Sequence, residues 1–369
     1  MIPPRSLRSS DTSHDRTDRT DRAMMRRALV LARRGWGQTA PNPLVGAVVV
    51  RDGVIVGEGF HARYGEAHAE VAALAAAGEA ARGATVFVTL EPCNHQGQTP
   101  PCVDALIAAG VHRVVAAMPD PNSLAQGGAA RLRAAGIAVE FGVEADAARE
   151  LNAAFAFAAS GATRPWVTIK LAVSLDGAIA DASRAQRWLT GDKARREVHR
   201  LRAAHDAVAV GIGTVLADNP QLTVRQGKRP RVPPLRVVFD RDARLPITSK
   251  LVRSARRTPT IVVAEHPDSA RAAALSKSGV QIETVSGLGP ALQLLRGKGV
   301  QSLLVEGGAG IAGAFLKAGL ADRLIIFQAP VLLGAGALPA FGTAPGIERL
   351  RLVDRQEFDE DLMSVYALR

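Results

Sequence analysis

The stretch TVFVTLEPCNHQGQTPPC, residues 85–102, holds both cysteines of a 369-residue chain. Its first half is rich in β-branched and aromatic residues, which predicts a strand that brings Cys93 to the mouth of a sheet. Pro101 and Cys102 then open a helical segment that continues into DALIAAG. Two cysteines in so long a chain form no disulfide framework, which favours a reducing, cytoplasmic setting. The two thiols therefore need another chemical explanation.

A histidine and a glutamate stand at the start of an earlier helical segment, AHAEVAALAAAGEAA (67–81). The imidazole of His68 and the thiolates of Cys93 and Cys102 suit tetrahedral zinc, with the fourth position left for water. A helix N-terminus lowers the pKa of a thiol, so Cys102 is well placed to ligate. Zinc lowers the pKa of its bound water to roughly 7. Glu70 follows His68 by two residues and is predicted to carry a proton between this water and a substrate.

The order H-x-E, then P-C, then C resembles the signature of zinc-dependent base deaminases. One feature differs, because eight residues separate the cysteines here and only two do so in that signature. The longer loop adds His95, Gly97 and Thr99 as candidates for substrate contact. The alternative is a purely structural zinc site, which would close its fourth position with another Cys or His, and His95 is the candidate for that position.

Length and composition favour two globular domains. Hydrophobic residues make up 47% of the chain and charged residues 22%, as in soluble globular proteins. We expect a disordered tail at residues 1–20, a helix from about 21 to 34, a first domain at 21–162 and a second at 163–369, divided near SGATRPW. Strands alternate with helices in both, which predicts α/β folds. We expect no signal peptide and no membrane span.

The excess of positive charge is concentrated in two segments, residues 1–34 and residues 225–257. The chain has a net charge of +11, and residues 225–257 alone contain eleven Lys or Arg against two Asp. Such a patch could hold phosphorylated small molecules or a nucleic-acid backbone, or be a solvated basic loop. Aromatic residues make up only 4% of the chain, which disfavours nucleic acid because few side chains can stack on bases.

The second domain contains a Gly-rich junction, SLLVEGGAGIAGAFLKAG (302–319), which reads as a strand, a turn and a helix. Backbone amides at a helix N-terminus bind phosphate, and missing side chains allow close approach. The spacing is not G-x-G-x-x-G, so a Rossmann dinucleotide site is not supported. Tight packing of the turn is the alternative explanation.

Several motifs together resemble the bifunctional deaminase/reductase family of riboflavin biosynthesis. They are PNPLVGAVVV, GEAHAEVAAL and TLEPCNHQGQTPPC in the first half, and KLAVSLDG, GTVLADNPQLTVR and VEGGAGIAGAFL in the second. The resemblance runs from about residue 21 to the C-terminus. It implies a cytidine-deaminase-like three-layer α/β/α domain, zinc-dependent, at 21–162, and a dihydrofolate-reductase-like α/β domain, NADPH-dependent, at 163–369.

The same resemblance implies two reactions. The first domain would remove the 2-amino group of 2,5-diamino-6-ribosylamino-4(3H)-pyrimidinone 5′-phosphate by hydrolysis. The second would reduce the ribosyl group of the product to ribityl. The expected partners are phosphorylated pyrimidines and further copies of the chain, with no nucleic acid and no membrane. The rival hypothesis is a zinc deaminase acting on nucleobases in RNA or DNA, with a second domain that is not catalytic.

Site residues follow from the resemblance. It implies His68, Cys93 and Cys102 as zinc ligands and Glu70 as the proton carrier. Expected contacts to substrate or cofactor are Asn42, His61 and His95 for the first substrate; Lys170, Asp176, Gln186, Arg202, Leu222, Arg225 and Glu306 for the second; and Ala172, Trp188, Thr214, Asp218, Gly308, Ala309, Gly310, Ile311, Ala312, Gly313 and Ala314 for NADPH.

Several of these expectations have plain structural alternatives. Asn42 could be only a turn residue between two prolines, and Trp188 only a core aromatic. His61 and His95 could be surface histidines, and Asp176 with Gly177 a plain turn. For the 2′-phosphate of NADPH we expect Arg241 or Arg244, which follow the predicted strand LRVVFD.

Overall fold

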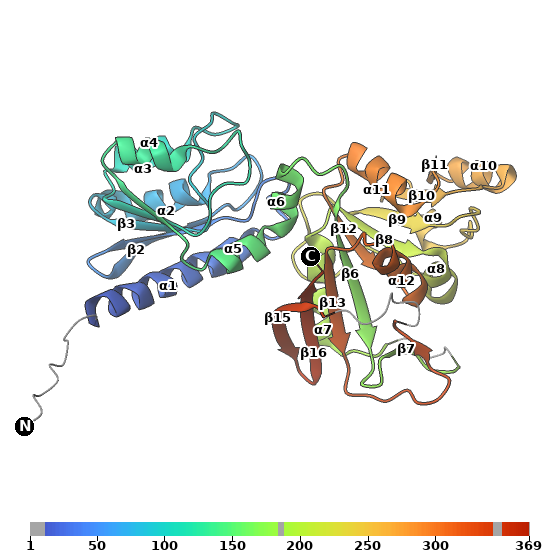
Figure 1. The fold of residues 1–369 in the computed structure, drawn as a ribbon. Coiled ribbons are helices and arrows are strands. Elements are labelled where there is room, and N and C mark those ends of the chain that lie inside the picture. Colours follow the sequence, from blue (N-terminus) through green and yellow to red (C-terminus); the bar gives the residue numbers. More distant parts are fainter. Residues whose placement is uncertain (1–11, 184–187, 342–348, 369) are drawn as a thin grey trace, which may run out of the picture. The chain divides into compact units, whose positions relative to one another are not determined.

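The structure is a computed structural model that describes residues 12–183, 188–341 and 349–368, and Gln186 lies outside these described residues (Figure 1). Its internal contacts divide the chain into two units, Met1–Ala159 and Ser160–Arg369. Within the described residues, no helix is long and apolar enough to cross a membrane. Each unit is described by itself.

The first unit is built on a five-stranded sheet of order β2-β1-β3-β4-β5. The strands are β1 (Gly46–Arg51), β2 (Val54–Phe60), β3 (Thr85–Val88), β4 (Arg113–Ala116) and β5 (Ala138–Phe141). Strand β1 is antiparallel to β2 and β3, whereas β3, β4 and β5 run parallel. The turn of the β1–β2 hairpin is formed by Asp52 and Gly53, with φ of 50° and 77°.

Helices cover both faces of this sheet. Figure 1 shows α1 and α5 on one face and α2, α3 and α4 on the other. The helices are α1 (Thr12–Ala32), α2 (Ala69–Ala77), α3 (Cys102–Ala109), α4 (Gly128–Ala134), α5 (Ala145–Leu151) and α6 (Ala153–Ala159), with 3-10 turns at Arg33–Gly35 and Gly78–Ala81. The expected α/β/α layering of the first domain is confirmed.

Two glycines of β2 allow α2 to lie against the sheet. A Cβ on Gly57 would lie 2.3 Å from the carbonyl oxygen of Ala73, and one on Gly59 would lie 2.4 Å from that of Ala69. Both contacts are with helix backbone, which cannot move aside. Since β2 residues two apart share a face, this pair of glycines sets the height of α2 above the sheet. The N-terminal end of α2 carries the H-x-E motif.

The structure corrects the expected start of the first helix. Helix α1 begins at Thr12, so residues 12–20, expected in the tail, continue the helix; extending a formed helix avoids the cost of nucleation. Helices α5 and α6 are parted at Asn152, whose buried amide exchanges two hydrogen bonds with the backbone of Leu44.

The second unit contains a nine-stranded sheet of order β11-β10-β9-β8-β12-β6-β13-β16-β15. Neighbouring strands from β11 through β13 in this order run parallel. Strand β16 is antiparallel to β13, and β15 is antiparallel to β16. The bounds are β6 (Trp166–Val173), β8 (Ala207–Gly211), β9 (Leu235–Phe239), β10 (Thr260–Ala264), β11 (Gln281–Thr284), β12 (Ser302–Glu306), β13 (Arg323–Gln328), β15 (Arg351–Phe358) and β16 (Asp361–Ala367), with a small second sheet of β7 (Ala178–Ala180) and β14 (Leu338–Pro339).

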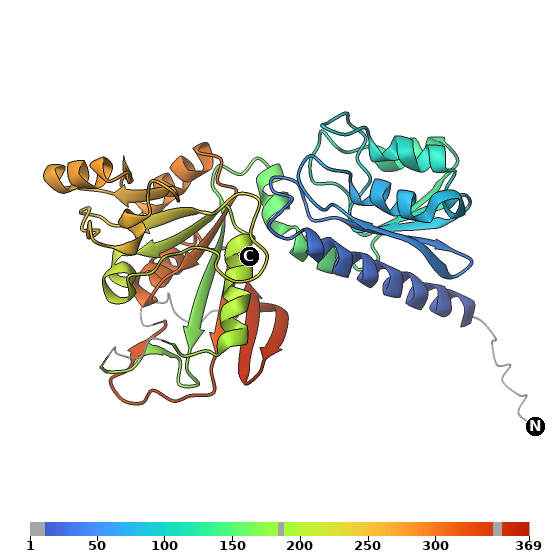
Figure 2. The same cartoon turned by 180° about the vertical axis from the view of Figure 1, so that it is seen from behind.

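The side chains of alternate residues on the central strands pack into two hydrophobic cores, one on each face of the sheet. On β8, Val208 and Val210 pack with α7 and α8, whereas Ala207 and Ala209 pack with α11 and α12. Figure 2 shows α7 in front of the sheet. The helices are α7 (Asp192–Ala203), α8 (Ile212–Asp218), α9 (Lys250–Arg253), α10 (Ser269–Lys277), α11 (Leu288–Gly297) and α12 (Ala309–Lys317). The expected α/β fold is confirmed, although strands β7, β11, β14, β15 and β16 were not predicted.

Candidate active sites

A cluster of potential metal ligands lies at the carboxyl end of β3. His68 is the residue before α2, Cys93 follows β3, and Cys102 is the first residue of α3. Their ligand atoms all lie within 4.8 Å of one another, and His95 is not a member of this cluster. The Nδ1 atom of His68 faces both sulfurs, at 3.2 Å from Cys102 Sγ and 3.5 Å from Cys93 Sγ. The cluster matches the three predicted ligands.

The two thiols differ in acidity. A hydrogen bond with the Cys102 thiol lowers the pKa of Cys93 to about 4, and the Cys102 backbone N–H also donates to Cys93 Sγ at 3.4 Å. The pKa of Cys102 is raised, because the Cys93 sulfur lies beside it and its surroundings are buried. The expected lowering of the Cys102 pKa by the helix N-terminus is wrong, because the neighbouring Cys93 sulfur and burial raise it. The amide at that terminus favours the Cys93 thiolate instead.

Glu70 lies beside the cluster in the first turn of α2 and is only 4% exposed. Burial raises the pKa of its carboxyl group to about 7, and the negative charge of Cys93 adds to the effect. A carboxyl group with a pKa near neutral can both accept and return a proton.

The cluster borders a cavity of about 300 Å³. Asn42 and His61 line it, and Asn42 Nδ2 lies 3.1 Å from His61 Nε2. On the other side of the ring, His61 Nδ1 lies 3.1 Å from the carbonyl oxygen of Ala67, so Nδ1 donates and Nε2 accepts. This arrangement orients the Asn42 amide at the cavity wall.

His95 also lines the cavity, and its buried Nδ1 has no hydrogen-bond partner among the described residues. In the same loop, Gln98 donates to the hydroxyl of Tyr64 at 3.0 Å. An unpaired polar atom buried beside a cavity suits a ligand that supplies the missing bond.

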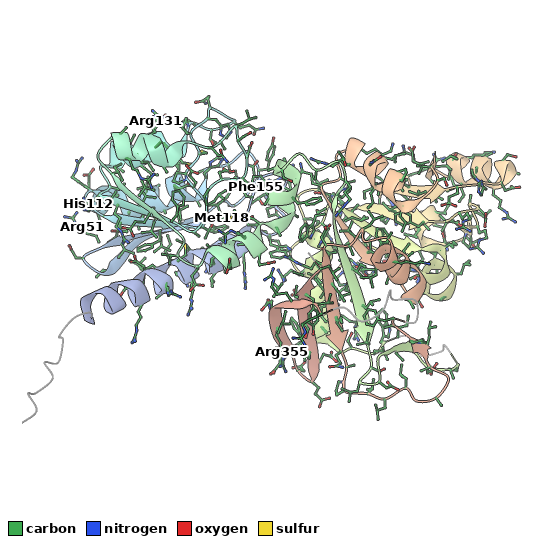
Figure 3. All side chains as sticks on the ribbon, viewed as in Figure 1. Arg51, His112, Met118, Arg131, Phe155 and Arg355 are labelled. Atoms are coloured by element: carbon green, nitrogen blue, oxygen red, sulfur yellow. The ribbon has the colours of Figure 1, made fainter. Side chains whose placement is uncertain are left out.

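Several further lining residues were not predicted, among them Tyr64, Asp120, Asn122 and Phe155. Phe155 reaches the cavity from α6 (Figure 3). Asp120 is 5% exposed, and burial raises its pKa to about 6. The signal that could have found Asp120 and Asn122 is their position just after β4, the neighbour of β3, because parallel strands end at one edge of the sheet.

The second unit brings together a group of charged side chains. Arg202 of α7 donates from Nε and Nη2 to the two oxygens of Glu306 on β12, at 2.6 and 2.7 Å. Lys170 lies opposite Glu306 in the register of β6 and β12. Burial lowers the pKa of Lys170, and Arg202 adds to this while Glu306 opposes it. These three predicted residues therefore meet.

The segment between α8 and β9 carries two more predicted residues. The side chain of Leu222 is buried, so any contact to a substrate would come from its backbone. Arg225 is exposed, and its Nη1 donates to Gln221 Oε1 at 3.1 Å. Burial and the neighbouring Arg202 lower the pKa of Arg225.

The predicted cofactor residues lie on several elements of the second unit. Gly308 precedes α12, and its backbone N–H donates to Thr214 Oγ1 of α8 at 3.2 Å. Ala172 lies on β6 and is partly buried, and Asp218 is exposed at the end of α8. Trp188 is 64% exposed, so the alternative that it is a core aromatic is excluded.

Asp176 has bonds within the chain. Its carboxylate accepts hydrogen bonds from the Ser174 hydroxyl and from the backbone N–H groups of Leu333 and Gly334, which lower its pKa to about 2. These bonds tie the β6–β7 turn to the segment after β13.

The two arginines expected at a 2′-phosphate already face carboxylates. Arg241 Nε lies 3.0 Å from Glu265, and Arg244 Nε lies 3.8 Å from Asp240. Both follow the carboxyl end of β9 and are exposed by half or more.

Two family models match the chain: the cytidine and deoxycytidylate deaminase zinc-binding region over residues 18–118, and the RibD C-terminal domain over residues 165–364. The chain is 44% identical over 319 residues to the riboflavin biosynthesis protein RibD of Aquifex aeolicus, which covers 86% of this chain and 88% of that protein. It is 43% identical over 357 residues to RibD of Escherichia coli, covering 92% and 95%. The chain belongs to the RibD family.

Solved structures of the RibD family share the fold. Acinetobacter baumannii RibD superposes with a TM-score of 0.79 at 41% identity, covering 95% of this chain and 99% of that one. A diaminohydroxyphosphoribosylaminopyrimidine deaminase/5-amino-6-(5-phosphoribosylamino)uracil reductase from Thermotoga maritima has a TM-score of 0.80 at 35% identity, with the same coverage. These similarities confirm the cytidine-deaminase-like and dihydrofolate-reductase-like domains.

The chemistry of the cluster fits the zinc of the RibD family's deaminase domain. One imidazole and two cysteine sulfurs lie within 4.8 Å of one another at the border of the cavity, a donor set that suits zinc. A divalent cation bound by them would stabilise both thiolates.

The Gly-rich turn fits a dinucleotide phosphate of the reductase domain. A Cβ on Gly308 would lie within 3.8 Å of Thr214 Oγ1 and 3.7 Å of Ile179, whereas one on Gly310 or Gly213 would meet nothing within 4 Å. The turn thus leaves open space at the N-terminus of α12, where backbone amides favour an anion.

Proposed function

We propose that the chain catalyses two consecutive steps of riboflavin biosynthesis: deamination in the first unit and reduction in the second. The observation that carries the proposal is the cluster of His68, Cys93 and Cys102 with Glu70 at the edge of a cavity. The first substrate is 2,5-diamino-6-ribosylamino-4(3H)-pyrimidinone 5′-phosphate, whose 2-amino group is replaced by oxygen. The product's ribosyl group is then reduced to ribityl.

In the deaminase unit, zinc held by His68, Cys93 and Cys102 supplies a water molecule with a lowered pKa. The Glu70 carboxylate would carry the two protons of the attacking water one after the other, the first to a ring nitrogen of the pyrimidine and the second to the leaving ammonia. The Asn42 amide offers a donor and an acceptor to the edge of the pyrimidine. His61 fixes the orientation of that amide. His95 supplies a further polar contact from the long loop between the cysteines.

In the reductase unit, NADPH supplies the hydride. Residues 308–314, with Thr214, Ala172, Trp188 and Asp218, hold the cofactor along the carboxyl ends of β6, β8 and β12. Lys170 and Glu306 lie next to each other on neighbouring strands and face the ribosyl group. Arg241 or Arg244, which both follow the carboxyl end of β9, would hold the 2′-phosphate.

The charges of the reductase site suit a phosphorylated substrate. Arg202 and Arg225 carry positive charge, and the carboxylate of Glu306 is paired with Arg202. The buried amine of Lys170 lies opposite Glu306, and burial lowers its pKa. A phosphate monoester carries a charge of roughly −1.5 to −2 at pH 7. The exposed guanidinium of Arg225 can offer paired N–H donors to its oxygens.

The decisive experiment supplies the diamino pyrimidinone phosphate to the full chain with and without NADPH. Without NADPH, we expect ammonia and the deaminated ribosyl product, and with NADPH the ribityl product. Absence of ammonia release from zinc-loaded protein would overturn the proposal. The rival hypothesis instead requires base conversion in RNA or DNA oligonucleotides, which the same assay can follow.

The remaining sequence expectations stay predictions. The division into deaminase and reductase domains at 162/163 is supported by the division of internal contacts between Ala159 and Ser160, and limited proteolysis tests it. The cytoplasmic location and the homo-oligomer are tested by fractionation and by light scattering on the purified chain.

A further inference from the structure

The segment Gln221–Arg225, between α8 and β9, has an unusual backbone. Leu222 has a φ of +55°, in the left-handed region, and its side chain is 2% exposed. A left-handed conformation is unfavourable for an L-residue with a side chain. Contacts from other elements must therefore hold the segment in this shape.

Two arginines supply part of that support. Arg202 Nη1 of α7 donates to the carbonyl oxygen of Thr223 at 3.0 Å, and Arg236 Nη1 of β9 donates to that of Gln221 at 3.3 Å. Arg236 is fully buried, so its bond does not compete with solvent. Both arginines hold carbonyl groups and leave the N–H groups of the segment to another partner.

His199 is that partner for Arg225. The backbone N–H of Arg225 donates to His199 Nδ1 at 3.3 Å. His199 lies on α7 three residues before Arg202, on the same face of the helix, and is 7% exposed. Because Nδ1 accepts a hydrogen bond, the ring is neutral and carries its proton on Nε2.

The position requires a neutral acceptor. A lysine or arginine has no lone pair to offer the Arg225 N–H. A carboxylate would accept the bond but would also pair with Arg202 or Arg225 and cancel the charge that attracts an anion. The neutral imidazole accepts the bond from the Arg225 N–H and adds no negative charge. Burial, with Arg202 and Arg225 adding their repulsion and Glu306 opposing it, lowers the pKa of His199 to about 4.

We propose that His199 is a positioning residue for the reduction step: its Nδ1 fixes the backbone of Arg225 and so directs that guanidinium, together with Arg202, toward the phosphate of the substrate. The inference rests on the proposed function, which supplies the phosphate. The side chain of Arg225 is exposed and held only at Gln221 Oε1 among the described residues, so its direction depends on how its backbone is fixed.

Two substitutions in the full chain separate the two ring nitrogens. The amide oxygen of Asn can occupy the position of Nδ1, whereas the amide of Gln reaches the position of Nε2. We expect His199→Gln to raise the KM of the deaminated ribosyl phosphate about tenfold, the usual effect of losing one hydrogen bond, with little change in kcat. His199→Asn should rescue most of this loss. With the dephosphorylated substrate, the two variants should have the same kcat/KM.

Controls distinguish the possible failures. Deamination by the first unit and the dissociation constant of NADPH should be unchanged in both variants. Equal KM values for wild type, Asn and Gln, or equal losses with and without the substrate phosphate, would overturn the inference. Loss of NADPH binding in His199→Gln alone would also overturn it, since the role would then be structural. Failure of the wild-type chain to reduce the substrate would instead overturn the proposed function.

Discussion

Each of the two candidate sites lies at the carboxyl ends of parallel strands in its own sheet, but the two sites use different kinds of side chain. The deaminase site depends on three ligand atoms within 4.8 Å and one buried carboxyl group, all contributed by short sequence motifs. The reductase site is a balance of charges, with Arg202, Lys170 and Glu306 contributed by α7, β6 and β12. A metal site accepts few residue types, whereas a charge balance can be assembled in many ways. The deaminase site is therefore easier to recognise from the sequence than the reductase site.

The largest effect should follow from removing a ligand. Cys102→Ala removes a fully buried sulfur, so we expect loss of zinc and a fall of deamination to background, because the remaining two ligands bind zinc weakly. Metal analysis and ammonia release measure this. Reduction of the separately supplied deaminated product is the internal control, and its loss would show that the two sites are not independent.

Removing the proton carrier should spare the metal. We expect Glu70→Gln to keep zinc and to lower the deamination rate about a thousandfold, the typical size of general acid–base catalysis. Glu79→Gln, an exposed glutamate just after α2, is the matched control and should behave as wild type. A wild-type rate in Glu70→Gln would show that another group moves the proton.

Breaking the charge balance should affect stability as well as reduction. Glu306→Ala leaves Arg202 buried without its partner, which we expect to destabilise the second unit by about 3 kcal/mol. Hydrogen exchange followed separately for peptides of each unit measures the change. Glu360→Gln, exposed in the same unit, is the control. Unchanged exchange near α7 and β12 would mean that the pair contributes no stability.

The close packing of α2 can be tested without touching a site residue. Gly59→Ala places a Cβ against the backbone of α2, and we expect a loss of about 1–3 kcal/mol in the first unit together with weaker zinc binding. The control is Gly289→Ala, where a Cβ meets nothing within 4 Å. Full stability of Gly59→Ala would indicate that α2 can lift away from β2.

The smallest effect concerns pH. The pKa of His199 is about 4 in the folded chain and that of an unfolded histidine is about 6.5, so the unfolded state binds more protons between these values. His199 therefore stabilises the fold above pH 6.5, and this stability is lost as pH falls toward 4. Urea unfolding of wild type and His199→Asn across this range should give a steeper pH dependence for wild type. Identical slopes would contradict the shift.

The zinc cluster and most strands could be predicted because local patterns carry them. His68 and Glu70 open a helix, and Cys93 and Cys102 lie at a strand end and a helix start. Phe155 could not be predicted, since it reaches the cavity from α6, whereas Asp120 and Asn122 were missed although their position just after β4 could have indicated them. Strands β15 and β16 were missed because their alternation mixes charged and half-buried residues.

The amino-acid order by itself determined the two α/β layers, the ligand set and the Gly-rich turn, because each depends on residue type and short spacing. Only the tertiary structure decided which thiol is the more acidic, where α1 starts and how the backbone of the Gln221–Arg225 segment is fixed. Those properties depend on burial and on charges from distant elements. Their energies arise only after the chain has folded and water has been excluded.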